Sequence, residues 1–494
     1  MLSASTLLGD TDHALVKKSV VKVYSIQRGY SLTSPWKRLT SKTVSGSGVL
    51  IASDQVLTNY HVVAMSTDVS ISLDGQSERL SGTVEATAPG IDLALIRLET
   101  AVADQVTPLE VASSTPKSGS KIQVFGYPKG GESISITEGV VSRREHVRYK
   151  YRTYGLRTQI DAPLNSGNSG GPMIADNKIV GIAFSGLSSS NDIGYAIACE
   201  EINEFLEDVK DGSYDGKPQL WLHSQTLASK DMRRWLNMPD GSTGIKFAAM
   251  PIPVDDYPLQ FNDVITHIGS FDVNNLGKVN LDDNTQVSYV HAVEQSAEDG
   301  IVPAKILRDG KSMDVELPVF RDPHYLLDHQ PDRPPTYFVY GPIVFGVATA
   351  DFLSSFDALV ARGGSSGRAA SAVLSIMQQS ENPYFTRRYD RVKDKDQELV
   401  VISKLISNRM TRDTRVALPA VVRSINGQKI TSIREAAERI NSLDEDLLVI
   451  EFEDNRGTTI VFDRDAIESS HQEIMEENAI FNSSSKNLSD VWDR

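Results

Sequence analysis

The sequence predicts a mainly β protein in which one β-rich domain precedes two smaller α+β modules. Three observations support this fold class. The chain has 494 residues, which at about 100–200 residues per domain indicates three or four domains. Residues 20–198 read as short apolar or alternating runs rich in β-branched residues, separated by Gly-rich turns, a pattern typical of barrels and sandwiches. Helical patterns become frequent only after that region, where they mix with strands.

The domains follow in order along the chain. An N-terminal segment (1–19) precedes the β-rich domain (20–210), which ends in a helix predicted over residues 200–209. A turn-rich boundary (210–218) leads to the first module (219–320), a Pro-rich linker (321–336) and the second module (337–464). Residues 421–452 repeat the strand and helix order of the first module, so we interpret the two as copies of one module. The polar tail (465–494) is expected to be loosely held.

Composition excludes several classes of protein. The chain is 40% hydrophobic and 23% charged, which is ordinary for a globular protein and argues against a disordered chain, a collagen-like fibre or a coiled-coil rod. No run approaches the roughly 18 apolar residues of a spanning helix, so we expect no membrane span. The one cysteine, Cys199, excludes an internal disulfide and is interpreted as a small apolar residue at a strand end.

Charge is unevenly distributed. The net charge is −15; residues 1–210 carry 20 Lys+Arg against 22 Asp+Glu, and residues 211–494 carry 30 against 43. Neither part offers the basic field that nucleic acid requires, so no nucleic-acid partner is expected. The N-terminus lacks a basic region before an apolar run, which Asp10 and Asp12 would interrupt. A cytoplasmic or other intracellular location is therefore favoured, with the periplasm or an organelle as the alternative if a targeting segment lies outside this chain.

Three short segments of the β-rich domain carry residues suited to acyl transfer. His61 follows a strand in LTNYHVV, Asp92 opens a strand in GIDLALIRL, and Ser169 lies in LNSGNSGGPMI. Nucleophilic acyl transfer requires a hydroxyl, a base that activates it and a carboxylate that orients the base. Ser169, His61 and Asp92 would supply these three roles. The backbone N–H groups of Gly167, Asn168 and Ser169 are the candidate oxyanion donors, with those of Gly167 and Ser169 pointing into one concavity.

An alternative interpretation of the serine segment fails on order. Gly167-x-Ser169-x-Gly171 also fits the nucleophile elbow of α/β-hydrolases, whose triad runs Ser, Asp, His in a helix-rich chain. Here the histidine precedes the serine and the surrounding sequence has almost no helices. The order His, Asp, Ser within a β-rich domain favours the acyl-transfer triad described above over the nucleophile elbow.

These motifs carry a family resemblance. Residues 20–210, with TNYHVV, DLALI, GYP, GVVS and NSGNSGGP, are similar to the chymotrypsin-like protease domain of the Deg/HtrA family, closest to its plant Deg branch, and both modules resemble PDZ domains. The resemblance implies a chymotrypsin-like double β-barrel followed by two PDZ-like domains. It also implies an ATP-independent serine endopeptidase for unfolded or damaged proteins, acting in protein quality control without a metal or cofactor. Assembly as homotrimers or their multiples, including hexamers, is expected, with Tyr30 and Trp36 in the trimer contact.

The resemblance also assigns peptide-binding strands. In the first module, Leu220, Trp221 and Leu222 correspond to the strand that receives a peptide C-terminus, with Trp221 where the family has glycine. In the second module Gly341 is retained but Pro342 removes an N–H donor. We therefore expect peptide capture by strand addition in the first module and an interaction or assembly role for the second.

A specificity pocket is expected beside the serine. Its walls would come from Ala162, Pro163 and Leu164 on one segment and Ala183, Phe184 and Ser185 on a strand, opposite residues 193–196. Asp161 lies too far upstream to form the pocket floor. Apolar walls favour small or medium aliphatic side chains over Arg or Lys.

One basic segment stands out. Six of the fifteen residues 143–157 are Arg or Lys. The segment is either a solvated hairpin or a regulatory loop in which Arg143 and Arg144 meet the acidic modules and couple peptide occupancy to the active site. Two alternative functions are a protease-derived chaperone or scaffold with little turnover, and a PDZ adaptor, which would leave residues 20–210 unexplained.

Overall fold

The computed structural model of the chain describes residues 11–102, 106–184, 194–250, 256–321, 325–394 and 396–493. The chain forms two compact units. The first consists of Met1–Gln27 and Ser41–Asp322, and the second of Arg28–Thr40 and Pro323–Arg494. A short stretch of the β-rich domain, residues 28–40, therefore groups with the C-terminal part of the chain.

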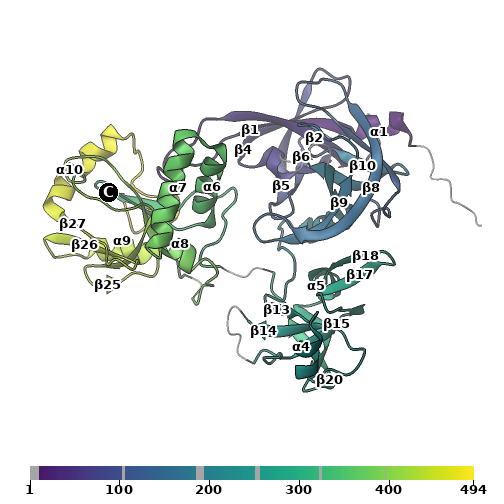
Figure 1. Ribbon diagram of the computed structural model, residues 1–494. Helices are drawn as coiled ribbons and strands as arrows, with labels where there is room; N and C mark the ends of the chain where they lie inside the picture. The colour runs from purple at the N-terminus through teal and green to yellow at the C-terminus, as the bar shows by residue number, and fades with distance from the viewer. Residues whose placement is uncertain are drawn as a thin grey trace, which may run out of the picture. The chain divides into compact units, whose positions relative to one another are not determined.

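The β-rich domain, called the barrel domain below, contains two closed six-stranded barrels (Figure 1). The first barrel has β1 (Val20–Gln27), β2 (Lys42–Ala52), β3 (Gln55–Asn59), β4 (Ser66–Ser72), β5 (Arg79–Ala88) and β6 (Leu93–Leu98), in the order β1-β2-β3-β6-β5-β4. The second has β7 (Lys121–Gly126), β8 (Ser135–Arg148), β9 (Tyr154–Ile160), β10 (Pro172–Ala175), β11 (Lys178–Phe184) and β12 (Gly194–Ala198), in the order β10-β11-β12-β9-β8-β7. The predicted double β-barrel is confirmed.

A glycine in β2 lets two neighbouring strands of the first barrel pack closely. A Cβ on Gly48 would lie 2.7 Å from Cγ1 of Val56, so only glycine lets β2 and β3 approach here. Three short helices frame the barrels: α1 (His13–Ser19), α2 (Tyr60–Val63) and α3 (Cys199–Asp208). Asp12 caps α1, whose Val16 is fully buried in the barrel core, so the last part of the N-terminal segment belongs to this domain.

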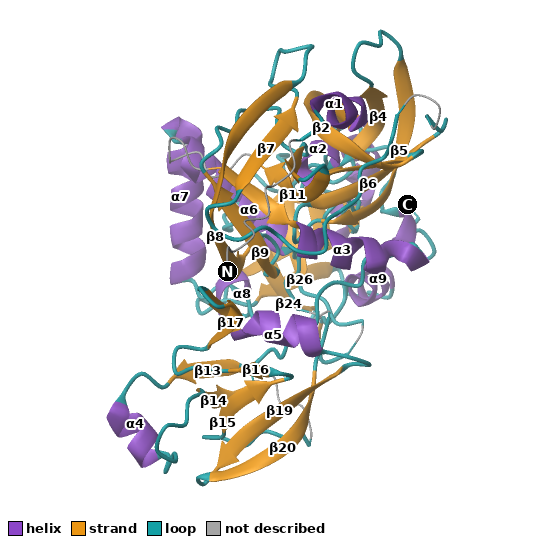
Figure 2. Cartoon of the chain, turned by 90° about the vertical axis from the view of Figure 1, so that its right-hand side faces the viewer, coloured by secondary structure: helices purple, strands orange, loops and turns teal. Residues whose placement is uncertain are grey.

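The first module is a sheet with one covering helix (Figure 2). Its elements are β13 (His223–Thr226), α4 (Lys230–Trp235), β14 (Ile245–Ala249), β15 (Val264–Ile268), β16 (Phe271–Asp272), β17 (Lys278–Asp282), β18 (Thr285–Ser288), α5 (Tyr289–Ser296), β19 (Ile301–Arg308) and β20 (Lys311–Pro318). The sheet order is β13-β14-β15-β19-β20, with β16 paired to β15. Ser229 caps α4 by accepting from the Met232 N–H at 3.4 Å, as its position before the helical pattern predicts.

The second module repeats this topology. It contains β21 (Tyr337–Tyr340), β22 (Ile343–Val347), α6 (Ala350–Arg362), α7 (Gly364–Gln379), α8 (Pro383–Thr386), β23 (Val400–Leu405), β24 (Ala420–Ile425), β25 (Gln428–Lys429), α9 (Ile433–Asn441), β26 (Leu447–Phe452), β27 (Thr459–Asp463) and α10 (Arg464–Glu477). The order β22-β23-β24-β26-β27, with β25 paired to β24, matches the main sheet of the first module, whose separate β17–β18 hairpin has no counterpart here, and β21 adds an edge. The helical pair α6 and α7, side by side in Figure 1, occupies the segment after Asp351 where the resemblance weakens.

The C-terminal segment is not a loosely held tail, and that expectation is wrong. Residues 464–477 form α10, and Ile467, Leu488 and Trp492 are buried in the core of the second module. The ring of Trp492 lies 4.5 Å from that of Phe338, and its indole N–H donates to the Val339 carbonyl. The polar residues of this segment alternate with the apolar ones, and the latter share one buried face.

The described part of the Pro-rich linker is also packed. Leu326 and Leu327 are buried in an apolar cluster with Tyr384 of α8 and Val401 of β23. This segment therefore contributes core to the second module instead of acting only as a connector. Across the residues that the structure describes, no helix combines the length and apolar character that a membrane crossing requires.

Candidate active site

The carboxylate of Asp92 holds His61 at two points. The Nδ1 atom of His61 lies 2.7 Å from Oδ2 of Asp92, and the His61 backbone N–H donates to Oδ1 at 2.9 Å. Asp92 is buried, which shields both contacts from water. A proton kept on Nδ1 by this carboxylate leaves Nε2 as a hydrogen-bond acceptor, the form a general base needs.

Strand pairing brings these two residues together. Antiparallel β3 and β6 place Asn59 opposite Leu93, so the residues just outside each strand meet. Asp92 takes a left-handed conformation (φ +62°), and its carbonyl accepts from the Tyr60 N–H at 3.0 Å and from Nδ2 of Asn59 at 3.1 Å. Aspartate tolerates this conformation better than most residues, and the bonds to Asn59 and Tyr60 fix it.

The Ser169 turn lies against the same region through β2. The carbonyl of Ser169 accepts from the Ser47 N–H at 2.8 Å. A Cβ on Gly46 would lie 2.7 Å from Cγ2 of Val62 and 3.1 Å from the Ser169 carbonyl oxygen, so β2 separates α2 from the serine turn by a backbone's width. Gly170 has φ +86°, and a Cβ there would lie 2.1 Å from the Ser47 carbonyl. The structure therefore places the predicted nucleophile beside the helix that carries the predicted base.

The three candidate oxyanion donors differ in their bonding. Gly167 has φ +106°, and its carbonyl accepts from Oγ of Ser47 at 2.8 Å. The Asn168 N–H donates to the Asn165 carbonyl at 3.0 Å, so it is used inside the turn and is not aimed at a substrate. Asn168 is thus removed from the predicted donors by this bond, and Gly167 and Ser169 remain as predictions.

Apolar residues gather where the specificity pocket is expected. Ala162 and Ala183 are fully buried in one cluster, with Leu164 packed against it. A Cβ on Gly194 would lie 3.0 Å from both the Ala162 carbonyl and Cδ1 of Leu164, so the start of β12 faces this segment. The Asp161 carboxylate accepts from the Val140 N–H at 2.6 Å, which ties it to β8.

Two other predicted wall residues, Pro163 and Phe184, lie outside the apolar cluster of Ala162 and Ala183. Pro163 is exposed, and the ring of Phe184 contacts those of Tyr149 and Tyr195 at 5.8 and 6.2 Å. Ser185 lies outside the described residues. The structure therefore brings Ala162, Ala183 and Leu164 together in one cluster, and their role as pocket walls stays a prediction.

The basic segment is a hairpin formed by β8 and β9. Arg144 forms a hydrogen-bonded ion pair with Asp282 at the end of β17, and its side chain is 8% exposed. Arg143 instead remains exposed and pairs with Glu145 on its own strand. Of the two predicted regulatory residues, the structure brings only Arg144 to the first module.

Sequence reasoning missed a buried cluster of charges beside this contact. Lys217 lies 2.7 Å from Oε2 of Glu201 and 2.8 Å from Oε2 of Glu294, and His146 Nε2 lies 2.9 Å from the same Glu294 oxygen. Burial raises the pKa of Glu201 to about 8 and, together with His146, lowers the pKa of His291 to about 4. Glu201 and Glu294 are 93 residues apart along the chain, so no local sequence pattern indicates that they meet.

Trp221 takes a backbone conformation that favours glycine, the residue expected at this position. It has φ +46°, and the corresponding Gly341 in the second module has φ +53°. Both turns thus require the left-handed region, in which a side chain is strained. Trp221 is held there by its indole N–H, which donates to the Phe320 carbonyl at 3.1 Å. Leu220 is buried in the core and Leu222 is half-buried, immediately before the exposed strand β13.

The corresponding turn of the second module is occupied from within. The Gly341 N–H donates to Nδ1 of His471 in α10 at 3.0 Å, and a Cβ on Gly341 would lie 2.6 Å from Cγ2 of Ile467. A peptide carboxylate cannot take this donor while α10 is in place. This contact disfavours peptide capture at Gly341, and the interaction or assembly role of the second module stays a prediction.

The predicted trimer-contact residues lie in the 28–40 segment of the second unit. The ring of Trp36 lies 6.3 Å from that of Tyr337, and Nζ of Lys404 lies 5.9 Å from the Trp36 ring and 3.1 Å from Oγ of Ser34. Tyr30 is half-buried and stacks under the Arg38 guanidinium at 3.9 Å. Trp36 therefore has a partner within its own chain, and its place in a trimer stays a prediction.

Cys199 is an inert structural residue. It is fully buried at the start of α3, and Oγ1 of Thr115 lies 3.5 Å from its sulfur. Burial and the neighbouring Glu200 raise the pKa of its thiol to about 12. A thiol that stays protonated at neutral pH is a poor nucleophile.

Two six-stranded barrels with histidine, aspartate and serine in this order and arrangement define a trypsin-like serine protease domain. Residues 46–182 match the family model of a trypsin-like peptidase domain, and residues 327–487 match that of a PDZ domain. The putative protease Do-like 13 of Arabidopsis thaliana is 30% identical over 414 residues, covering 82% of each chain. The chain belongs to the Deg/HtrA family of serine proteases.

Other relatives place the chain in the same family over shorter spans. The mitochondrial protease Do-like 4 of Arabidopsis thaliana is 33% identical over 341 residues, covering 68% of this chain and 66% of that protein, and for the mitochondrial putative protease Do-like 3 the chain spans 62% of the relative. Among solved structures, the HtrA-type protease AlgW with a tripeptide has 20% identity and a TM-score of 0.49, covering 63% of this chain and 96% of that chain.

Proposed function

We propose that the protein is an ATP-independent serine endopeptidase that cleaves unfolded or damaged proteins and acts in protein quality control. The observation that carries the proposal is the double hold of Asp92 on His61, at 2.7 and 2.9 Å, beside the glycine-framed Ser169 turn. Such a hold fixes both the tautomer and the orientation of the imidazole, which structural histidines do not require.

The residues would act in two steps. Nε2 of His61 takes the hydroxyl proton of Ser169 as its oxygen attacks the scissile carbonyl, and Asp92 stabilises the imidazolium that forms. The N–H groups of Gly167 and Ser169 would stabilise the oxyanion. His61 then gives the proton to the leaving amine, which leaves an acyl-enzyme on Ser169. Water hydrolyses the acyl-enzyme, with His61 taking the proton of the water and returning it to Ser169.

The pocket supports cleavage after small or medium aliphatic residues. The proposed walls include the apolar Ala162 and Ala183, and the Asp161 carboxylate is already bonded to β8. A cationic side chain would lose hydration there without gaining a partner. Peptide libraries that vary the residue before the scissile bond test this preference against Arg and Lys.

Casein cleavage tests the proposed reaction. Ser169→Ala is expected to abolish turnover, by about 10⁶ in kcat when the nucleophile of a triad is removed. Ser166→Ala is the matched control, because this serine lies on the exposed side of the same turn and should leave cleavage unchanged. Negligible cleavage by both the unaltered chain and Ser169→Ala would instead favour a chaperone or scaffold derived from a protease.

The β8–β9 hairpin supports coupling of the first module to the active site. The Arg144–Asp282 pair joins β8 to the β17–β18 hairpin, and a peptide would add to β13 next to Leu222. Charge reversal at Arg144 is expected to change activation by peptides while basal casein cleavage persists. Arg143→Glu serves as the control, since Arg143 pairs only locally. Equal peptide activation in both variants would contradict the coupling.

Assembly and location complete the proposal. We propose homotrimers or their multiples, measurable by sedimentation of the full chain and of Trp36→Ala. The relatives named above as mitochondrial and the chloroplastic protease Do-like 2 support an organelle as the site of action. Fractionation of cells that express the complete natural protein tests this location against the cytoplasm.

A further inference from the structure

Three potential metal ligands meet between the barrel domain and the first module. They are His146 of β8 and two residues of α5, His291 and Glu294, whose donor atoms all lie within 4.8 Å of one another. His291 and Glu294 are three residues apart on a helix and therefore share a face. The imidazole centroids of the two histidines are 5.7 Å apart, with the rings inclined at 56°. None of the three residues belongs to the proposed catalytic triad.

The cluster has unsatisfied polar atoms. Among the described residues, Nδ1 of His146, Nδ1 of His291 and Oε1 of Glu294 are buried without a hydrogen-bond partner. The side chains of His146 and Glu294 are 0% and 1% exposed. A buried polar atom left without a partner destabilises the folded protein, because it has lost its hydrogen bonds to water. Three such atoms in one cluster indicate that a further ligand completes it.

The charges around the cluster also lack a counterpart. Lys217 is shared by the carboxylates of Glu201, Glu204 and Glu294, at 2.7, 3.3 and 2.8 Å. One ammonium therefore faces three carboxylates. Negative charge in a buried site is costly unless a cation offsets it, so these contacts favour a cation as the missing ligand.

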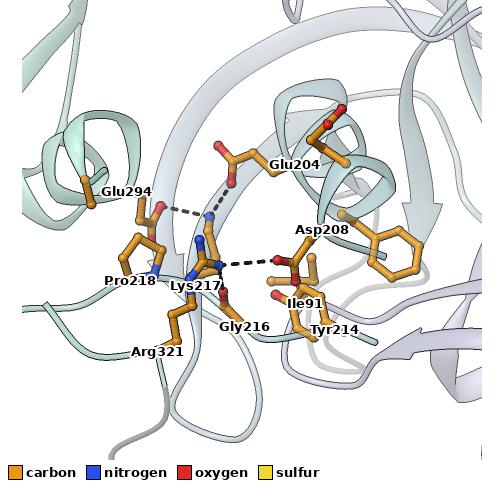
Figure 3. A pocket seen from close by; sticks show the side chains of 12 residues that line it. Ile91, Glu204, Asp208, Tyr214, Gly216, Lys217, Pro218, Glu294 and Arg321 are labelled. Carbon is orange, nitrogen blue, oxygen red and sulfur yellow. Dashed lines mark hydrogen bonds and ion pairs between the residues drawn. The ribbon is translucent and has the colours of Figure 1, made fainter. Parts of the chain in front are cut away.

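A pocket reaches the cluster from solvent. Its volume is about 240 Å³, and Lys217 and Glu294 form part of its wall. Figure 3 shows the Lys217 ammonium between the carboxylates of Glu204 and Glu294, with Arg321 directed to Asp208. Of the three proposed ligands, Glu294 lines this pocket, so a cation can approach the cluster from the side of this carboxylate.

We propose that His146, His291 and Glu294 bind a zinc ion that ties α5 of the first module to β8 of the barrel domain. Two imidazole nitrogens and one carboxylate oxygen are a known zinc ligand set, with bonds of about 2.0–2.2 Å, and water would complete the tetrahedron. Lys217 keeps its contacts with Glu201. The ion would bind away from the proposed catalytic triad and stabilise the docking of the module, so it leaves the metal-free reaction above unchanged.

Zinc binding to the untagged full chain tests the site. Ser169→Ala serves as the background, because it prevents self-digestion and makes the result independent of the proposed protease activity. After chelator treatment and dialysis, we expect one zinc per chain by metal analysis and calorimetry, and a rise in melting temperature that Mg²⁺ does not produce. His291→Ala should weaken zinc binding by at least about 100-fold.

Two further variants make the outcome decisive. Glu294→Gln keeps the shape of the side chain and should also lose zinc affinity, which guards against a folding defect in His291→Ala. His267→Ala removes a more exposed histidine of the same module and should bind zinc as the background does. Absence of stoichiometric zinc, or equal affinity in all variants, would overturn the proposal and leave Lys217 as the cluster's only counter-ion.

Discussion

Replacing Asp92 by asparagine tests whether its carboxylate sets the proton position on His61. Asp92 accepts two N–H groups, from the His61 backbone at 2.9 Å and from Nδ1 at 2.7 Å. An asparagine has one oxygen for these two donors. If that oxygen stays with the backbone N–H, the new NH₂ group faces Nδ1, which must then be an acceptor, and the ring proton moves to Nε2.

With its proton on Nε2, His61 cannot take the hydroxyl proton of Ser169. The same replacement in a characterised triad lowers kcat by about 10⁴, which is about 5.4 kcal/mol at 1.36 kcal/mol per tenfold. We expect a loss of this size for Asp92→Asn, with a smaller effect on KM because the pocket residues lie elsewhere.

The assay is steady-state hydrolysis of a fluorogenic peptide with an aliphatic residue before the scissile bond. Thermal denaturation is measured in parallel. Asparagine adopts the left-handed conformation as readily as aspartate, so the φ of +62° should persist and the melting temperature should change little. A kcat within tenfold of the unaltered chain, in a folded variant, would refute the assigned role of Asp92.

Three other predictions concern the turn, the C-terminal segment and the thiol. Gly170→Ala should inactivate the enzyme, because the new Cβ would lie 2.1 Å from a carbonyl oxygen of β2. Gly130 is the control: it is also left-handed (φ +83°) but has open space around it, so Gly130→Ala should cost only about 1 kcal/mol of stability and leave activity intact. In denaturant titrations, Trp492→Ala should destabilise the second module by about 3–5 kcal/mol. Phe481 is 92% exposed, so Phe481→Ala should destabilise it by less than about 0.5 kcal/mol. Equal effects of the two variants would contradict the packing of Trp492. Cys199, with a pKa of about 12, should react with iodoacetamide at pH 8 only after unfolding, and rapid labelling of the native chain would contradict its burial.

Local signals in the sequence predicted the two-barrel fold, and they marked the segments that carry the candidate triad. His61, Asp92 and Ser169 each follow or precede a strand, and their order along the chain is a property of the fold rather than of any one contact. The sequence marked Trp221 only as a departure from the expected glycine, and its left-handed conformation is seen in the structure alone.

Contacts between distant segments were beyond the reach of local patterns. The pairing of Arg144 with Asp282 was anticipated only as a general attraction between a basic segment and acidic modules, and the cluster around Glu294 was not anticipated. The packed C-terminal segment did carry a readable signal. Ile467, His471, Ile474 and Met475 recur at helical spacing and form the buried face of α10, but the many polar residues between them obscured it.

The grouping of residues 28–40 with the second unit has a consequence for how the chain can be dissected. The backbone passes between the two units three times, at residues 27–28, 40–41 and 322–323. A deletion that ends the chain near residue 320 therefore removes Tyr337 and Lys404, which cover Trp36 and Ser34. An isolated protease fragment would keep a stretch of its own β1–β2 connection stripped of its partners. Lost activity or aggregation of such a fragment would then report on this stretch rather than on regulation by the second module.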